Sequence, residues 1–170
     1  MKKFLLLAFS AALLSFSASA QKYAIIDTKY ILSKLPDYTA AEKRLEQISL
    51  QWQAELDTMQ AALDRMYKNY DAEQYMLSDD LKKKREDELF NKEKELRDLQ
   101  KRRFGYEGDL FKERQKLVKP IQDKVYNAVQ KMAVSRGYDF ILDKSEGITV
   151  IFADPKLDKS EDILRELGIK

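Results

Sequence analysis

The chain carries two long stretches with apolar residues at helical spacing, bounded by short stretches of β-forming residues. In the first, apolar residues recur every three or four positions from Ala41 to Tyr70, which predicts a helix with one apolar seam. The second begins near Ser78, a suitable helix N-cap, and runs to Arg136, where Gly137 can stop it. Its later half repeats an apolar residue every seven positions: Phe104, Phe111, Val118, Val125 and Met132. Because such seams need a partner, we expect the two helices to form an antiparallel hairpin.

The start of this hairpin and its irregular positions can also be read from the sequence. A short helix over Thr28 to Leu35 is expected to end at Pro36, and Thr39 with Glu42 forms a capping box that predicts the start of the first long helix. In the second helix, two glycines and a proline interrupt the pattern, and these hinge candidates are Gly105, Gly108 and Pro120. A tolerated local irregularity is the alternative reading.

Three β-forming stretches flank the hairpin and predict strands. They are Tyr23–Asp27, Tyr138–Asp143 and Ile148–Ala153, the last two joined by a loop of hairpin length, and a final short helix is expected over Asp158–Leu167. Strands this far apart in sequence must meet to form a sheet. We therefore predict an α+β, mostly α chain, with a β-rich body over residues 21–38 and 120–170. The helical-hairpin arm covers residues 39–119, with its tip near 71–80.

The first twenty residues have the three parts of a secretory signal. Two lysines precede an apolar run from Phe4 to Leu14, and Ala18 and Ala20 fit a cleavage site before Gln21. The apolar run is shorter than the roughly 20 residues of a membrane-spanning helix. We therefore expect cleavage after residues 1–20 and export of the remaining chain.

Several chemistries are excluded by residue type. The chain has no histidine and no cysteine, which removes histidine-based triads, thiolate nucleophiles and the usual zinc sites. Its five glycines form neither a phosphate-binding loop nor a dinucleotide fingerprint. The many carboxylates alternate with lysines and arginines, a pattern typical of a solvated helix surface. No enzyme activity, metal or cofactor is expected.

The charge and the apolar seam suggest where partners bind. Lys2 and Lys3 of the signal account for the formal net charge of +2, so the exported chain is neutral and nucleic-acid binding is not expected. A basic run near the tip and part of the seam remain as candidate client contacts, against the alternatives of a solvated face and a hairpin core. These candidates are Trp52, Met59, Met66, Tyr70, Lys82, Lys83, Lys84 and Arg85. The basic run could also contact lipid headgroups peripherally.

The order of these elements resembles the Skp (OmpH-like) family of periplasmic chaperones. The matching pieces are the signal, the strand Tyr23–Asp27 with Thr28–Leu35 behind it, the tip string Leu77–Leu81, the string Gly137–Leu142 and the final helix Asp158–Leu167. The resemblance implies a homotrimer, in which strands of three chains close a small β-barrel-like body and three arms project in the manner of a jellyfish. The family has no catalytic residues to carry over, and its better-known members are basic, unlike this neutral chain.

The resemblance implies an ATP-independent holdase that keeps unfolded outer-membrane proteins from aggregating in a cavity between the arms. The expected oligomerisation residues are Tyr23, Ile25, Ile26, Phe140, Ile141, Leu142, Val150, Ile151 and Phe152. A structural coiled-coil spacer or scaffold of the cell envelope is the alternative, in which the arm acts as a strut with its seam filled by fixed partners.

Overall fold

The structure is a computed structural model that describes residues 21–147 and 150–169. Two compact units can be distinguished. The mixed unit contains the described residues before Leu32 and those from Val125 onward, and the hairpin unit contains Leu32–Lys124. The expected signal at residues 1–20 lies outside the described residues.

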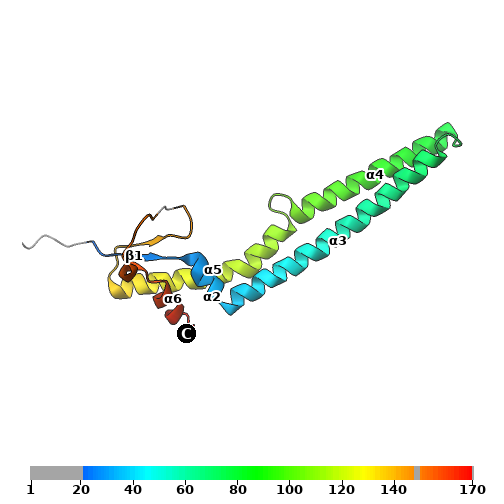
Figure 1. Ribbon diagram of the computed structural model, residues 1–170. Helices are drawn as coiled ribbons and strands as arrows, with labels where there is room; N and C mark the ends of the chain where they lie inside the picture. Colours follow the sequence, from blue (N-terminus) through cyan, green and yellow to red (C-terminus); the bar gives the residue numbers. More distant parts are fainter. Residues whose placement is uncertain (1–20, 148–149, 170) are drawn as a thin grey trace, which may run out of the picture. The chain divides into compact units, whose positions relative to one another are not determined.

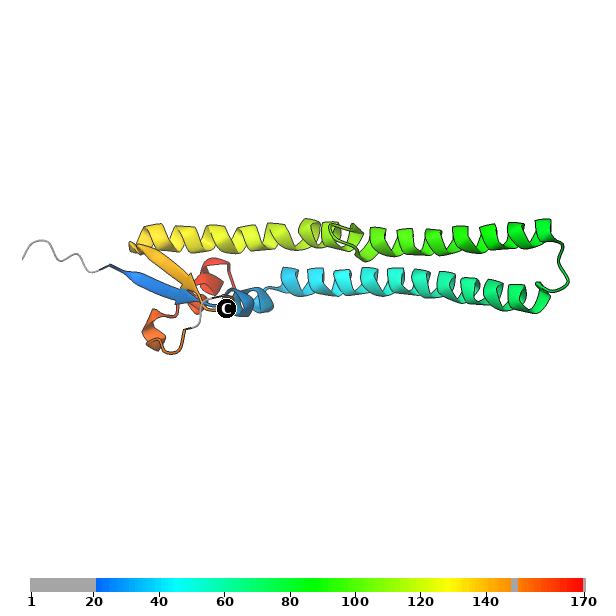
Figure 2. The ribbon, with the colours of Figure 1, turned by 90° about the horizontal axis from the view of Figure 1, so that it is seen from above.

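The hairpin unit is built from long helices (Figures 1 and 2). Helix α3 spans Pro36–Glu73, α4 spans Asp79–Phe104, and the unit includes the first part of α5, which spans Asp109–Arg136. In both views α4 lies beside the outer part of α3, over the whole length of α4. Buried leucines on both helices form the seam: Leu45, Leu56 and Leu63 on α3, and Leu89 and Leu99 on α4. The predicted hairpin is therefore confirmed in its main feature.

The first long helix begins earlier than the capping box indicated. Helix α3 starts at Pro36, with Leu35 as an extended N-cap, and Thr39 lies inside its first turn. The Thr39 hydroxyl bonds the Leu35 carbonyl at 3.4 Å instead of capping a helix start. Proline is well suited to the first helical position because its fixed φ is helical and its missing N–H has no intrahelical role there.

The second limb of the hairpin is not one helix, contrary to the prediction. Helix α4 ends at Phe104, and residues 105–108 form a short loop before α5 begins at Asp109. The loop is visible between the two green helices in Figure 1. By contrast, α5 continues through Pro120. The glycines, which favour non-helical backbone, thus end the helix, whereas the proline does not.

The mixed unit contains a two-stranded parallel sheet. Strand β1 (Tyr23–Ile26) pairs with β2 (Phe140–Asp143), with Tyr23 opposite Phe140 and Ile26 opposite Asp143. The sheet is parallel because the long helices return the chain to the same end at which β1 began. The meeting of the amino-terminal and carboxyl-terminal strands is confirmed.

The expected third strand and closed body are corrected by the structure. Residues 148–149 of the predicted strand lie outside the described residues, and Val150–Ala153 have no strand conformation. The described part of a single chain thus holds a two-stranded sheet and not a closed barrel. A strand needs a neighbour to satisfy its backbone groups, and Val150–Ala153 pair with no strand in the described part of the chain.

Short helices complete the mixed unit. Helix α2 spans Thr28–Lys34, a 3-10 turn (η2) spans Pro155–Leu157, and α6 spans Ser160–Glu166. The predicted final helix is confirmed, with Ile163 and Leu164 buried. Ile31 and Ile163 are the largest fully buried side chains in the described structure. They mark the centre of this small core.

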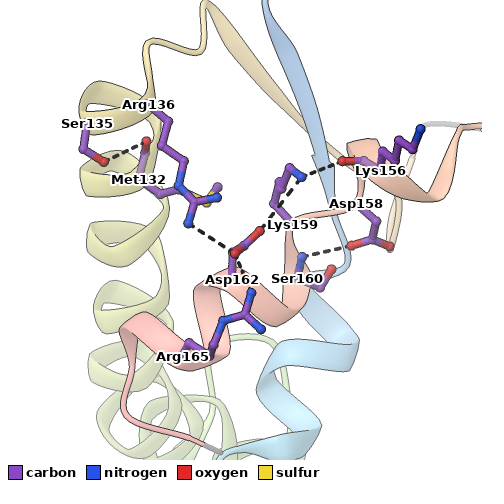
Figure 3. A network of polar contacts seen from close by, with 9 residues as sticks. All are labelled: Met132, Ser135, Arg136, Lys156, Asp158, Lys159, Ser160, Asp162 and Arg165. Atoms are coloured by element: carbon purple, nitrogen blue, oxygen red, sulfur yellow. Dashed lines mark hydrogen bonds and ion pairs between the residues drawn. The ribbon is translucent and has the colours of Figure 1, made fainter.

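Polar contacts fasten α6 to the end of α5 (Figure 3). The carboxylate of Asp162 accepts hydrogen bonds from Arg136 at 3.2 Å and from Arg165 at 2.6 Å. Glu166 forms a further ion pair with Lys131 of α5. The hydrogen bond from Arg136, with that from Arg165, lowers the pKa of Asp162, because both favour the charged carboxylate.

Candidate functional site

The predicted client-contact stripe on α3 lies along the seam of the hairpin. Trp52, Met59, Met66 and Tyr70 are all half-buried. Trp52 packs edge-on against Phe104 of α4, with the ring centres 6.4 Å apart. Near the tip, Met66 and Tyr70 line a small cavity of about 80 Å³ together with Leu89 of α4. The stripe is thus partly covered by the second limb, which leaves only its edges open to a partner.

Two tyrosines tie the outer half of the hairpin together. The hydroxyl of Tyr67 donates to Glu93 at 2.8 Å, and that of Tyr70 donates to Glu86. Each bond joins α3 to α4, and their order along the two helices shows that the limbs are antiparallel. The hydrogen bond to Glu86 raises the pKa of Tyr70, and the bond to Glu93 raises that of Tyr67, because the carboxylate favours the protonated phenol.

The predicted hinge residues are found at two separate places. Gly105 and Gly108 bound the loop between α4 and α5, whereas Pro120 lies exposed within α5. A side chain at either glycine would clash with backbone: a Cβ at Gly105 would lie 2.3 Å from the Lys101 carbonyl oxygen, and one at Gly108 would lie 2.8 Å from that of Arg102. Between them, Glu107 has a φ of 51°, in the left-handed region. The loop is therefore a specific structure that the glycines permit.

Strands β1 and β2 differ in how much of their surface is covered. Ile25 and Ile26 of β1 are buried, whereas Ile141 and Leu142 of β2 are half-buried. Tyr23 and Phe140 stack on each other, with ring centres 5.7 Å apart, yet both remain partly exposed. Beyond them, Val150 is half-buried, but Ile151 and Phe152 are 94% and 86% exposed. Of the predicted oligomerisation residues, those after β2 thus form an open apolar surface.

A comparison with known protein families covers almost the whole described chain. The family model for outer membrane protein (OmpH-like) matches residues 22–167. The chain belongs to the OmpH-like family. The sequence resemblance is thereby confirmed, and the hairpin and both strands fall within the matched range.

A solved structure has the same fold as this OmpH-like chain. It is an OmpH-like protein from Caulobacter crescentus CB15, a candidate outer membrane chaperone, at 19% sequence identity and a TM-score of 0.69. The match covers 89% of this chain and 86% of the other. At this identity the likeness concerns the fold. No curated protein matches the chain.

The basic run at the tip of the OmpH-like hairpin has acidic neighbours on both sides. Lys82, Lys83, Lys84 and Arg85 stand between Asp79–Asp80 and Glu86–Glu88, so four positive charges are flanked by five negative ones. Arg85 also pairs with Glu88 at 3.5 Å. Lipid-headgroup contact stays a prediction, and the local charge balance gives it little electrostatic support.

Sequence reasoning missed a set of apolar side chains that point away from the seam. Leu50 is 65% exposed and Phe90 is 60% exposed, and in the loop Tyr106 is 95% exposed. At the tip, Tyr75 and Met76 are also exposed. The sequence could have revealed two of them: Leu50 and Phe90 do not fall at the spacing of the seam residues, so they lie on other faces of their helices.

Two further features, a metal-binding group and a membrane-spanning helix, are absent from the described residues. They contain no group of three or more acidic side chains arranged to hold a metal ion. Among the same residues, none of the helices is both long enough and apolar enough to span a bilayer.

Proposed function

We propose that this protein is an ATP-independent holdase of the periplasm, which binds unfolded outer-membrane proteins and prevents their aggregation. The observation that carries the proposal is an OmpH-like chain built around a long helical hairpin with apolar side chains exposed along its length. The similar Caulobacter protein, a candidate outer membrane chaperone, supports the same role. Many weak contacts along such a surface can add up to useful retention without an energy source.

The proposal includes a homotrimer held by the mixed unit. A two-stranded sheet is marginal alone, and exposed neighbours such as Ile151 and Phe152 are unfavourable in water. Pairing with other copies of the chain would extend the sheet and cover these exposed side chains. The expected oligomerisation set from Tyr23 to Phe152 would then form the body, and the hairpins would enclose the client.

Client contact in this proposal involves two groups of side chains. The predicted residues of α3 offer only the edges of their side chains, because α4 covers part of them. The exposed Leu50, Phe90 and Tyr106 are free of such cover. We therefore assign them the larger share of the contact with unfolded chains.

An aggregation assay tests the proposal. An unfolded outer-membrane β-barrel is diluted from denaturant, and its light scattering is followed with this protein in molar excess and no nucleotide. We expect strong suppression and a complex that co-migrates in size exclusion. A variant with Leu50, Phe90 and Tyr106 changed to Ser should suppress less. Unchanged aggregation with the wild-type protein would refute the holdase and favour an envelope spacer or scaffold.

The oligomer is tested separately by its mass in solution. Sedimentation equilibrium should give three chains for the wild-type protein. The double variant Ile151→Ser and Phe152→Ser should be smaller, whereas Leu50→Ser should leave the mass unchanged. A wild-type monomer would contradict the trimer.

A further inference from the structure

Arg103 connects three helices at the loop between α4 and α5. Its guanidinium lies over the ring of Trp52 on α3, 4.6 Å from the ring centre. One terminal nitrogen bonds Glu55 of α3 at 3.3 Å, and the other bonds Asp109 at the start of α5 at 2.8 Å. The side chain is 24% exposed, which is low for an arginine on a helical hairpin. One residue therefore joins α3, α4 and α5.

The backbone next to Arg103 is interrupted. Residues 105–108 leave the helix axis, and Glu107 adopts a positive φ. The interruption is confined to one limb, since α3 runs without a break from Pro36 to Glu73 and passes the loop at Trp52 and Glu55. The hairpin unit thus has one limb that is a single unbroken helix, α3, and one limb in which a loop separates α4 from α5.

This asymmetry has a mechanical consequence. When a pair of packed helices bends, the limb on the outside must lengthen relative to the limb on the inside, and two unbroken helices resist such sliding. A short loop in one limb supplies the missing length, so bending concentrates there. Contacts that cross the loop oppose that movement.

The contacts of Arg103 are of a kind that can open. Its Nε is buried without a hydrogen-bond partner among the described protein atoms, so the observed contacts of Arg103 leave one of its donors unsatisfied. Its partner Glu55 is partly exposed, so water can replace it when the contact opens.

We propose that Arg103 is the latch of a joint in the hairpin: its contacts with Trp52, Glu55 and Asp109 hold the Gly105–Gly108 loop closed, and their release lets the outer part of the hairpin bend. Arg103 is a positioning residue in this device. The inference does not depend on the chaperone proposal, because the joint can be measured without a client.

The joint carries its own optical probe, because Trp52 is the only tryptophan of the chain. Arg103→Gln should shift the Trp52 emission to longer wavelength and raise amide exchange in residues 101–112 about tenfold, as expected for the loss of charge-assisted hydrogen bonds. Arg102→Gln is the matched control, since Arg102 is an exposed neighbour on the same helix. Arg103→Lys should give an intermediate result because an ammonium cannot bridge both carboxylates with the same geometry.

A distance measurement separates a latch from a merely stabilising residue. The chain has no cysteine, so spin labels can be placed through Lys43→Cys and Lys94→Cys, two exposed positions on α3 and α4. The distance distribution should broaden in the Arg103→Gln background and stay narrow with Arg102→Gln. Equal distributions in both backgrounds would overturn the proposal. So would faster exchange spread evenly along α3 and α4, which would show general destabilisation.

Discussion

The two units are stabilised in different ways. In the mixed unit, residues more than a hundred positions apart are bonded: the Asp27 amide donates to the Ser160 hydroxyl at 2.9 Å, and the Thr28 hydroxyl bonds Asp143. In the hairpin unit, the buried side chains are apolar residues spaced along the helices, most of them leucines, and several ion pairs join neighbours on one helix. The mixed unit depends on a few irreplaceable long-range contacts, whereas the hairpin unit depends on many similar small ones.

The largest expected effect is a buried charge in the mixed unit. Ile25 of β1 is 4% exposed, so Ile25→Asp would bury an unpaired carboxylate and cost about 3 to 5 kcal/mol of unfolding free energy. Ile141→Asp should be milder because Ile141 is only half-buried. Urea unfolding followed by circular dichroism measures both. The same change at Val134 of α5, which is 84% exposed, is the control, and equal losses at Ile25 and Val134 would contradict the distinction between core and open surface.

The second effect concerns two glycines at which a side chain is disfavoured for different reasons, a steric clash at Gly105 and a positive φ at Gly137. In the hairpin unit, Gly105→Ala would push a methyl group against the Lys101 carbonyl oxygen, which also accepts the Gly105 amide hydrogen bond. We expect a loss of about 1 to 3 kcal/mol. In the mixed unit, Gly137 has a φ of 64° and open space around it, so Gly137→Ala should cost only about 1 kcal/mol. A larger loss at Gly137 in urea unfolding would reverse this ranking.

The same contrast explains what the sequence could and could not predict. The hairpin follows from local periodicity, so its helices and its tip near Ser78 were predictable from spacing alone. The meeting of β1 with β2 was predictable because both stretches are β-forming and need a partner, whereas their parallel direction is a finding of the structure. The final helix α6 was predictable as well; Lys159 is its N-cap residue, and the carboxylate of Asp158 accepts the Ser160 amide at 2.9 Å just before it.

The failures have physical causes that spacing does not reveal. Gly105 and Gly108 were marked as irregular positions, but spacing does not reveal that the helix ends there, because the apolar pattern continues across the loop. The strand expected after β2 has β-forming residues, but Val150–Ala153 pair with no strand among the described residues, and β propensity alone does not form a strand. The role of Thr39 was misjudged because Pro36 starts the helix one turn earlier.

The third effect is acid sensitivity of the mixed unit. Burial alone would raise the pKa of Asp143 and of Asp158, but hydrogen bonds from Thr28 and Ser145 lower the first and those from Lys144 and Ser160 lower the second. Asp162 has a lowered pKa for the reasons given above. The stability from a lowered carboxylate pKa is present above the unfolded value of about 4 and is lost as the pH falls through the folded value.

We therefore expect the mixed unit to lose amide protection first as the pH falls below about 4. Asp162→Asn should remove part of this dependence and cost about 1 kcal/mol at neutral pH, because Arg136 and Arg165 lose their charged acceptor. Asp123→Asn, which affects only an exposed pair with Lys119 on α5, is the control. Simultaneous acid loss of protection in both units would contradict the expectation. Hydrogen exchange resolved by residue distinguishes the outcomes.

The smallest effect is expected on the surface of the hairpin unit. Lys92 and Glu95 pair at 2.6 Å, but both side chains are more than half exposed. Water and salt screen such a pair, and two long side chains lose rotamer freedom when they form it, so Lys92→Gln should change the unfolding free energy by less than about 0.5 kcal/mol. The difference in urea midpoint between Lys92→Gln and the wild-type protein should also stay the same when salt is added. A loss as large as that of Asp162→Asn would mean that surface charges stabilise the hairpin as much as they stabilise the mixed unit.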